Sequence, residues 1–179
     1  MIAETELIAK LKDPLTQDQA FRSLMSQYKE RLYWHIRKIV ISHDDADDVL
    51  QNTFIKVYRN INNFKADSKL YSWMYRIATN ESITFINKRA KLNNLDLNYM
   101  RYKMAENLEA DVHFDGDEMQ LLLQKAIAKL PQKQQLVFNM KYFDDLKYQE
   151  ISEILETSVG ALKASYHHAV KKIELFLTQ

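Results

Sequence analysis

The chain has 179 residues, of which 46% are hydrophobic and 27% are charged, and its formal net charge is +1. It contains no cysteine, which excludes disulfides and thiolate metal sites. Only 2 glycines and 2 prolines occur, which favours long helices over a turn-rich β fold. The N-terminus lacks a signal-peptide layout, and no apolar run approaches the roughly 20 residues that cross a bilayer, so we expect a cytoplasmic protein.

Four amphipathic segments fill the N-terminal half, and each places apolar residues at the three- and four-residue steps of one helical face. The first covers residues 1–12, and the second begins near Thr16 and runs to about Ile41. Thr16 is followed three residues later by Gln19, a pattern typical of a capping box. We therefore expect Thr16 to cap the second helix.

The third and fourth segments are separated by a short break. The third starts after Ser42 with aspartates, which are favourable at the positive end of a helix dipole, and Asn60–Phe64 ends it. Ser68 is positioned to cap the fourth, which extends to about Lys91. The acidic cluster at 43–48 has no Glu-x-x-His pair beside it, so we interpret it as a solvated or partner-binding helix start rather than a metal site.

Helical periodicity fades between residues 93 and 118, where polar residues dominate. Six acidic residues and no lysine or arginine lie between Ala105 and Met119. We interpret 93–118 as a flexible acidic linker, which also lets a near-neutral chain keep basic surfaces elsewhere. The sequence therefore predicts an all-α protein in which two small helical domains, 1–92 and 119–179, are joined by this linker.

The last third of the chain contains two amphipathic segments separated by a very short turn. Residues 148–155 form the first, Glu156–Ser158 the turn, and the second runs to about Phe176. Helices joined in this way form a helix-turn-helix, whose second helix can lie in the DNA major groove. An αα-hairpin of any helical bundle would show the same periodicity. Ser158 is a good N-cap candidate for the second helix.

Aromatic, basic and amide residues cluster on the fourth helix. Trp73 lies between Tyr71 and Tyr75, beside Arg76, and Asn80 follows two turns later. Such side chains can stack on unpaired bases and hydrogen-bond to them, although Trp73 is explained equally well as a core residue.

No nucleophile–base pair or metal set is visible in the sequence, so we expect no enzyme activity, no cofactor and no small-molecule substrate.

Three segments taken together go beyond a generic helix-turn-helix. They are Asp45–Phe54, Ser72–Asn80, and Leu130–Pro131 followed by 148–151 and 159–163. In this order they resemble the extracytoplasmic-function (ECF) sigma factors of bacterial RNA polymerase, from about Leu15 to Phe176. The resemblance implies an alternative sigma factor that binds core polymerase, recognises the −10 and −35 promoter elements and promotes DNA melting.

The resemblance also implies three sets of site residues. Docking on the clamp coiled coil of the largest polymerase subunit would use Asp47, Asp48, Gln51 and Ile55. The −10 element would be bound by Asn62, Asn63, Phe64, Lys65, Trp73, Arg76, Asn80, Lys88 and Arg89. The −35 element would be bound by Ser158, Val159, Gly160, Ala161, Lys163, Ala164, Ser165, His167 and Lys171. An anti-sigma factor is the expected regulatory partner.

The chain departs from the family pattern at several positions. Glu156 stands at the turn where glycine is common, and Ser165 and His168 replace arginines of the recognition helix. A left-handed backbone at Glu156 would cost about 1 kcal/mol.

Two other functions stay open at this stage, a helix-turn-helix regulator that never contacts polymerase and a helical adaptor with no role on DNA. Run-off transcription with core polymerase separates them, because only a sigma factor starts transcription by itself.

Overall fold

The computed structural model describes residues 4–106 and 117–178, and every regular element in these ranges is helical. The elements are α1 (Glu4–Lys12), α2 (Gln17–Val40), α3 (His43–Asn60), the 3-10 helix η1 (Ile61–Asn63), α4 (Leu70–Leu92), α5 (Leu97–Glu106), α6 (Glu118–Ala128), α7 (Gln132–Tyr142), α8 (Tyr148–Leu155) and α9 (Val159–Leu177). The all-α fold class expected from the scarcity of glycine and proline is confirmed. None of the described helices is both long and apolar enough to span a membrane.

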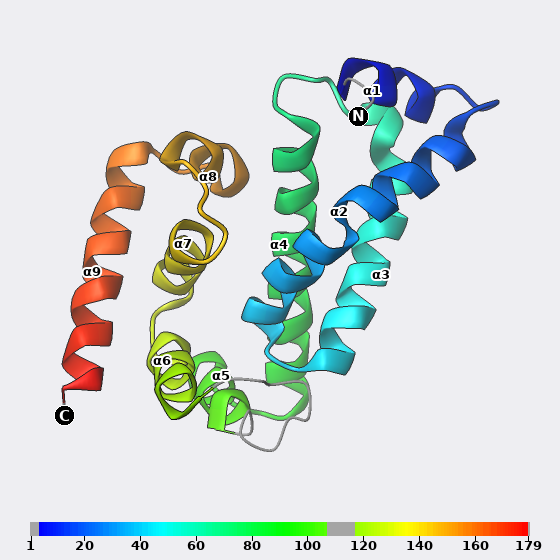
Figure 1. The fold of residues 1–179 in the computed structure, drawn as a ribbon. Coiled ribbons are helices and arrows are strands. Elements are labelled where there is room, and N and C mark those ends of the chain that lie inside the picture. Colours follow the sequence, from blue (N-terminus) through cyan, green and yellow to red (C-terminus); the bar gives the residue numbers. More distant parts are fainter. Residues whose placement is uncertain (1–3, 107–116, 179) are drawn as a thin grey trace.

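Helices α1–α4 form what we call the N-terminal body. Helices α2, α3 and α4 pack against one another, and α1 lies against the start of α2 (Figure 1). Leu24 and Ile36 of α2 share one apolar core with Val57 of α3 and Met74 of α4, and all four side chains are fully buried. The apolar stripes seen in the sequence are the faces that meet in this core.

Helices α6–α9 form the C-terminal body. Helix α9 packs on α6, α7 and α8, and residues 156–158 connect α8 to α9, which confirms the predicted helix-turn-helix. Ile127, Phe138, Ala169 and Ile173 form a small core of their own where α6 and α7 meet α9. This core leaves the N-terminal half of α9 free to present its outer face.

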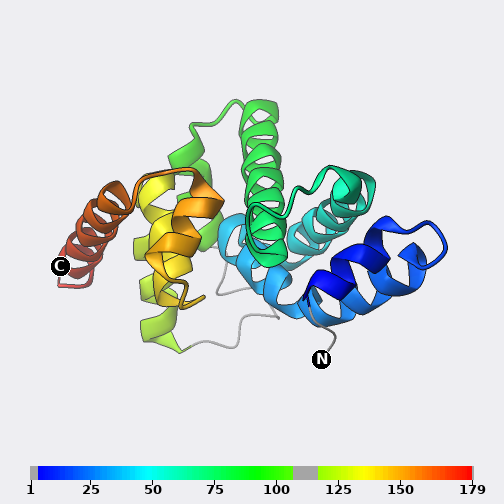
Figure 2. The ribbon, with the colours of Figure 1, turned by 90° about the horizontal axis from the view of Figure 1, so that it is seen from above.

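The two bodies are packed against each other, with α4 between them (Figures 1 and 2). Helix α8 lies against α4, and α7 contacts α2. Leu136 and Met140 of α7, Ile151 of α8 and Leu162 of α9 belong to the same apolar core as α2, α3 and α4. The sequence predicts two domains joined by a tether, and this shared core is an additional feature that periodicity does not reveal.

Part of the predicted linker is helical. Helix α5 lies within residues 93–118 and packs against α6. Its buried Ala105 forms a small apolar cluster with Leu121 of α6 and with Ile41, which follows α2. The helix therefore fixes one section of the linker beside both bodies. Residues 107–116 of the predicted linker lie outside the described residues.

The structure contains the predicted helix cap at Ser158 and a second cap, at Ser42, that was not predicted. The Ser42 hydroxyl accepts a hydrogen bond from the Asp45 amide at the start of α3, with an oxygen–nitrogen distance of 3.5 Å. The Ser158 hydroxyl accepts from the Ala161 amide at the start of α9, at 3.4 Å. Each bond satisfies one of the backbone amides that a helix start leaves without a partner. The cap at Ser158 also fixes where the recognition helix begins.

Two other predicted caps are wrong. Thr16 Oγ1 donates to the Lys10 carbonyl at 2.9 Å, so α2 begins without a side-chain cap. Helix α4 begins at Leu70, and the Leu70 amide donates to Glu4 Oε1 of α1 at 3.1 Å. A carboxylate from a distant part of the chain thus takes the role predicted for Ser68. The capping preferences of neighbouring residues identify local caps, and they do not reveal a cap that tertiary packing supplies from a distant residue.

The turn between α8 and α9 contains a left-handed residue, at the position where the family commonly has glycine. Glu156 has φ 50° and ψ 44° and ends α8 as its C-cap. A residue with a Cβ atom is strained in this region, and glycine is not. The turn is therefore strained at the point that sets the angle between the two helices of the helix-turn-helix.

We expect Glu156→Gly to be more stable than Glu156→Ala by about 1 kcal/mol, since both lose the carboxylate and only alanine keeps the strained Cβ. Urea unfolding of the two variants measures the difference directly. Comparison of this pair removes the contribution of the Glu156 side-chain contacts. Equal midpoints for the two variants would show that the turn relaxes at no cost.

Candidate functional site

Helix α3 presents the predicted docking residues together on its outer face. Asp48, Gln51 and Ile55 are exposed, with Ile55 46% accessible to solvent. Asp47 is partly exposed, and its carboxylate lies 3.6 Å from His43 Nε2 one turn earlier. The opposite face of α3 is buried in the core. An exposed isoleucine beside acidic and amide side chains is the composition of a protein-docking surface rather than of a solvated helix face.

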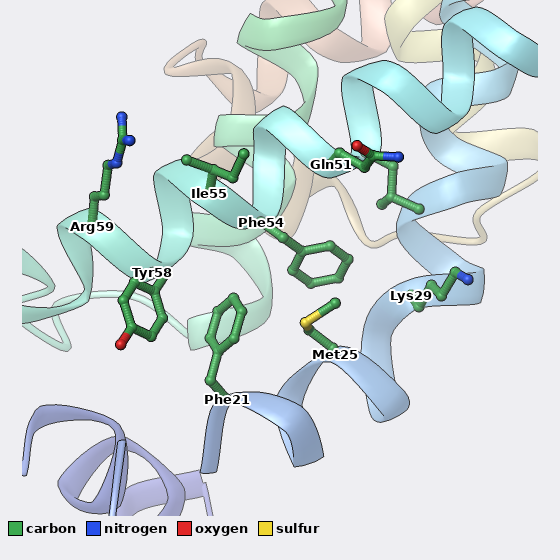
Figure 3. A pocket seen from close by; sticks show the side chains of 9 residues that line it. Phe21, Met25, Lys29, Gln51, Phe54, Ile55, Tyr58 and Arg59 are labelled. Atoms are coloured by element: carbon green, nitrogen blue, oxygen red, sulfur yellow. The ribbon is translucent and has the colours of Figure 1, made fainter. Parts of the chain in front are cut away.

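An apolar groove lies between α2 and α3, directly beside this face (Figure 3). Its volume is about 750 Å³, and its lining residues are Phe21, Met25, Lys29, Leu50, Gln51, Phe54, Ile55, Tyr58 and Arg59. Figure 3 shows Phe21, Met25 and Phe54 pointing into the space between the helices, with Gln51 and Ile55 on α3 above it. The groove thus continues the exposed surface of α3 into a deeper apolar site.

Helix η1 and the loop after it expose three of the residues predicted to bind the −10 element, Asn62 and Asn63 in η1 and Lys65 in the loop. Phe64 is buried, and its ring centroid lies 5.2 Å from that of Trp73 on α4. Phe64 therefore packs the loop against Trp73. Trp73 itself is only partly buried, so one part of the indole stays accessible beside the loop.

The remaining predicted −10 residues lie along α4. Arg76 is partly buried, Asn80 and Lys88 are exposed, and Arg89 forms an ion pair with Asp45 at the start of α3. The Arg76 guanidinium donates to the C-terminal body, to Glu156 Oε1 at 2.8 Å and to the Glu153 carbonyl at 2.6 Å. One predicted DNA-binding cation is thus engaged across the contact between the two bodies.

Helix α9 carries the predicted −35 residues on the face turned away from both cores. Gly160, Ala161, Lys163, Ala164 and His167 are exposed, as are Ser158 and Lys171, and Val159 and Ser165 are partly exposed. A Cβ atom at Gly160 would meet nothing within 4 Å, so this glycine is an open position at the start of the helix. Small residues here allow close approach of the helix to another molecule.

A buried polar group joins the two bodies. Asp144 lies in the turn before α8, and its side chain is 5% exposed. Its carboxylate accepts from His35 Nδ1 of α2 at 3.1 Å and also pairs with Lys38. His35 Nε2 lies 2.9 Å from Thr79 Oγ1 of α4. Burial alone would raise the pKa of Asp144, but the hydrogen bonds and charges of His35 and Lys38 outweigh it, so the pKa lies below its ordinary value. Asp144 is therefore ionised at neutral pH.

Sequence reasoning missed both the groove and the buried polar group. Phe21 and Met25 are identified by periodicity only as core residues, and nothing in the pattern shows that they border a groove. His35 and Asp144 are 109 positions apart, so no local signal connects them. Asp144 is followed by Asp145, and the pair resembles an ordinary polar turn.

Comparison with known proteins identifies two family regions in this chain. The family model described as Sigma-70 region 2 matches residues 24–92, and that described as Sigma-70, region 4 matches residues 120–173. The chain is 33% identical to the ECF RNA polymerase sigma factor SigW of Bacillus subtilis over 167 residues, covering 88% of this chain and 89% of that protein. It is 29% identical to the ECF RNA polymerase sigma-E factor of Haemophilus influenzae, with 87% and 86% covered.

Solved structures show the same fold. CnrH, in its complex with the cytosolic domain of CnrY, is similar with a TM-score of 0.72 and 20% identity, and 99% of this chain and 98% of that chain are covered. The sigma factor RpoE of Bartonella quintana, in complex with the anti-sigma factor NepR, is similar with a TM-score of 0.68 and 18% identity, covering 88% and 96%. Since both sigma regions are matched in order and the match to SigW spans most of both proteins, the chain belongs to the ECF sigma factors, the non-enzymatic alternative sigma factors with which RNA polymerase initiates transcription.

Proposed function

We propose that the outer face of α3 and the apolar groove beside it form the docking site for core RNA polymerase. The observation that carries this assignment is the continuity between exposed Ile55 and the groove of about 750 Å³. In a coiled coil the a and d side chains pack between its own helices, and its outer positions are often charged. Cations on its outer surface would meet Asp47 and Asp48, and an apolar side chain beside them would enter the groove. The clamp coiled coil of the largest polymerase subunit is the partner with this chemistry.

The two DNA elements are assigned to the two bodies. Residues 1–92 would bind the −10 element, with the loop at Asn62, Asn63 and Lys65 and the partly exposed Trp73 capturing an unstacked base. Unstacking costs a few kcal/mol, which stacking on an aromatic ring and hydrogen bonds to the base offset. Residues 119–179 would bind the −35 duplex through the outer face of α9. The exposed small residues at its start support this assignment because they permit close approach to the major groove.

The cellular setting follows from these partners. Bacterial core polymerase and promoter DNA lie in the cytoplasm, and we place this protein there. Two relatives of similar fold were solved in complexes, one with the cytosolic domain of CnrY and one with the anti-sigma factor NepR. An anti-sigma factor is accordingly the regulatory partner we propose for this chain. Run-off transcription with purified core polymerase tests the proposal as a whole, and absence of promoter-dependent transcripts would overturn it.

We expect Asp48→Lys combined with Ile55→Asp to abolish co-purification with core polymerase. Both side chains are exposed, so the fold should persist, whereas the changes reverse a charge and place a carboxylate beside the apolar groove. Affinity capture of core enzyme on the tagged sigma factor measures the effect. Glu174→Lys on the exposed face of α9 is the matched control for the change of charge, and it should retain core binding. Full retention by the α3 variant would refute the docking assignment.

We expect Lys163→Ala to weaken binding to a −35 duplex and to reduce the slope of log affinity against log salt by about 1, because one phosphate contact is lost. The duplex is taken from a promoter that the protein transcribes in the run-off assay. Fluorescence anisotropy across a salt series provides the measurement.

Lys172→Ala is the control for this experiment. Lys172 is exposed on the same helix, nine residues further along, and an α-helix of 3.6 residues per turn places it on the opposite face. The same charge is removed from the same helix, so only a contact specific to the Lys163 face distinguishes the two variants. Identical salt slopes for both would show that this face of α9 does not lie against DNA.

A further inference from the structure

The contact between the two bodies covers the part of α4 that carries predicted DNA-binding residues. Arg76, Thr79 and Asn80 line a narrow cleft of about 300 Å³ whose other wall is formed by α7, α8 and the turn after α8. Thr79 is only 2% exposed. A base or a phosphate that approached this stretch of α4 would collide with α8. The arrangement therefore covers the Arg76 side of the proposed −10 surface, while Asn80 and the outer face of α9 stay exposed.

Three ion pairs between described residues cross this contact with the same polarity. Cations of the N-terminal body meet acids of the C-terminal body, in the pairs Lys38–Asp144, Arg76–Glu156 and Lys69–Glu150. One of these cations, Arg76, belongs to the surface that is proposed to bind nucleic acid. A carboxylate accepts from a guanidinium or ammonium group in the same way as a phosphate oxygen does. DNA and the C-terminal body would compete for Arg76.

Asp144 is the central group of the contact. Its side chain is 5% exposed, whereas the exposed fractions are 73% for Glu156 in the pair with Arg76 and 66% for Lys69 in the pair with Glu150. Exposed pairs contribute little because water and salt screen them, and a buried carboxylate with two hydrogen-bonding partners contributes much more. The charged and titratable side chains around it are His35, Lys38 and Arg31 on α2 and Tyr71 and Tyr75 on α4.

We propose that the contact is an autoinhibitory latch in which Asp144 holds the C-terminal body against α4 and blocks access of single-stranded DNA to Arg76. The proposal rests on the assignment of α4 as a −10 reader. In the closed form the docking face of α3 and the outer face of α9 are both accessible. Polymerase can therefore bind the closed protein, and its separation of the two bodies would release α4.

The apolar side chains of the contact influence the equilibrium between the closed form and an open form in which the two bodies are separated. Leu136, Ile151 and Leu162 are buried with the N-terminal core, so opening exposes apolar surface and is unfavourable in the free protein. Loss of the Asp144 carboxylate removes an ion pair and weakens the hydrogen bond to His35. Hydrogen bonds to charged groups are worth enough that we expect the ratio of open to closed molecules to rise about tenfold or more.

The opening can be measured because the chain has no cysteine of its own. Spin labels are placed on Ser23→Cys in α2 and Lys172→Cys in α9, two exposed sites on different bodies. Pulsed electron spin resonance then reports the distance distribution between the bodies in the full-length protein. The parent protein should show one narrow peak in the distance distribution, and Asp144→Asn should add a second, broader population at a different distance.

Asp145→Asn is the matched control. It makes the same change at the next residue, whose side chain is 97% exposed and has only a 3.7 Å pair with Lys141 of its own body. Lys38→Gln is the second test variant and removes the partner of Asp144 from the other side of the contact. Circular dichroism verifies that each variant is folded. Distance distributions of both Asp144→Asn and Lys38→Gln that match the parent would overturn the latch.

A binding measurement separates this proposal from the one on which it rests. Short single-stranded DNA of random sequence is titrated onto the parent, Asp144→Asn and Asp145→Asn proteins at fixed salt. A gain in affinity that accompanies the opening in Asp144→Asn alone supports the inhibitory role. Opening without any gain in affinity would leave the conformational latch in place and would overturn the assignment of α4 as the reader of single-stranded DNA.

Discussion

Helix α4 is the element on which the rest of the structure depends, because it is buried on nearly every side. Leu70, Met74, Ala78 and Ile86 lie in the core, and Tyr75 between them is also fully buried. A helix that is apolar around most of its circumference requires neighbours on all of its faces. Helices α2 and α3 cover one side, and α8 covers another. Helices α2 and α3 leave part of the apolar surface of α4 uncovered, and the C-terminal body lies where it covers that part.

The covering of α4 by α8 is mixed in character, which distinguishes it from a permanent core. Apolar residues such as Ile151 lie beside a buried polar set of His35, Thr79 and Asp144. Buried polar groups contribute little net stability, but each must keep its partners or pay the full desolvation cost. Such a set therefore selects one arrangement of the two bodies over slightly shifted ones. Contacts of this composition are typical of domains that separate during function.

The sequence predicted the helices well because each depends on local periodicity and on a buried stripe. It predicted the cap at Ser158 and the start of a helix after Ser42, which are properties of a few adjacent residues. It failed at Ser68, because Glu4 of α1 caps α4 instead. It failed in the same way at the groove and at Asp144, since both arise where helices distant in the sequence meet. The site residues implied by family resemblance lie on accessible faces, except where Phe64 and Arg76 are engaged by other parts of the chain.

The near-neutral charge of the chain is explained in part by ion pairs between its two bodies. A sigma factor needs cations on its DNA-binding surfaces, and a net charge of +1 leaves few of them uncompensated. Part of the compensation is intramolecular, since Arg76, Lys38 and Lys69 face Glu156, Asp144 and Glu150 across the two bodies. Added salt weakens the exposed pairs and the attraction of DNA alike. Among these pairs, that of the buried Asp144 is screened least by salt. The interaction that we propose to hold the closed form together is therefore the one that added salt weakens least.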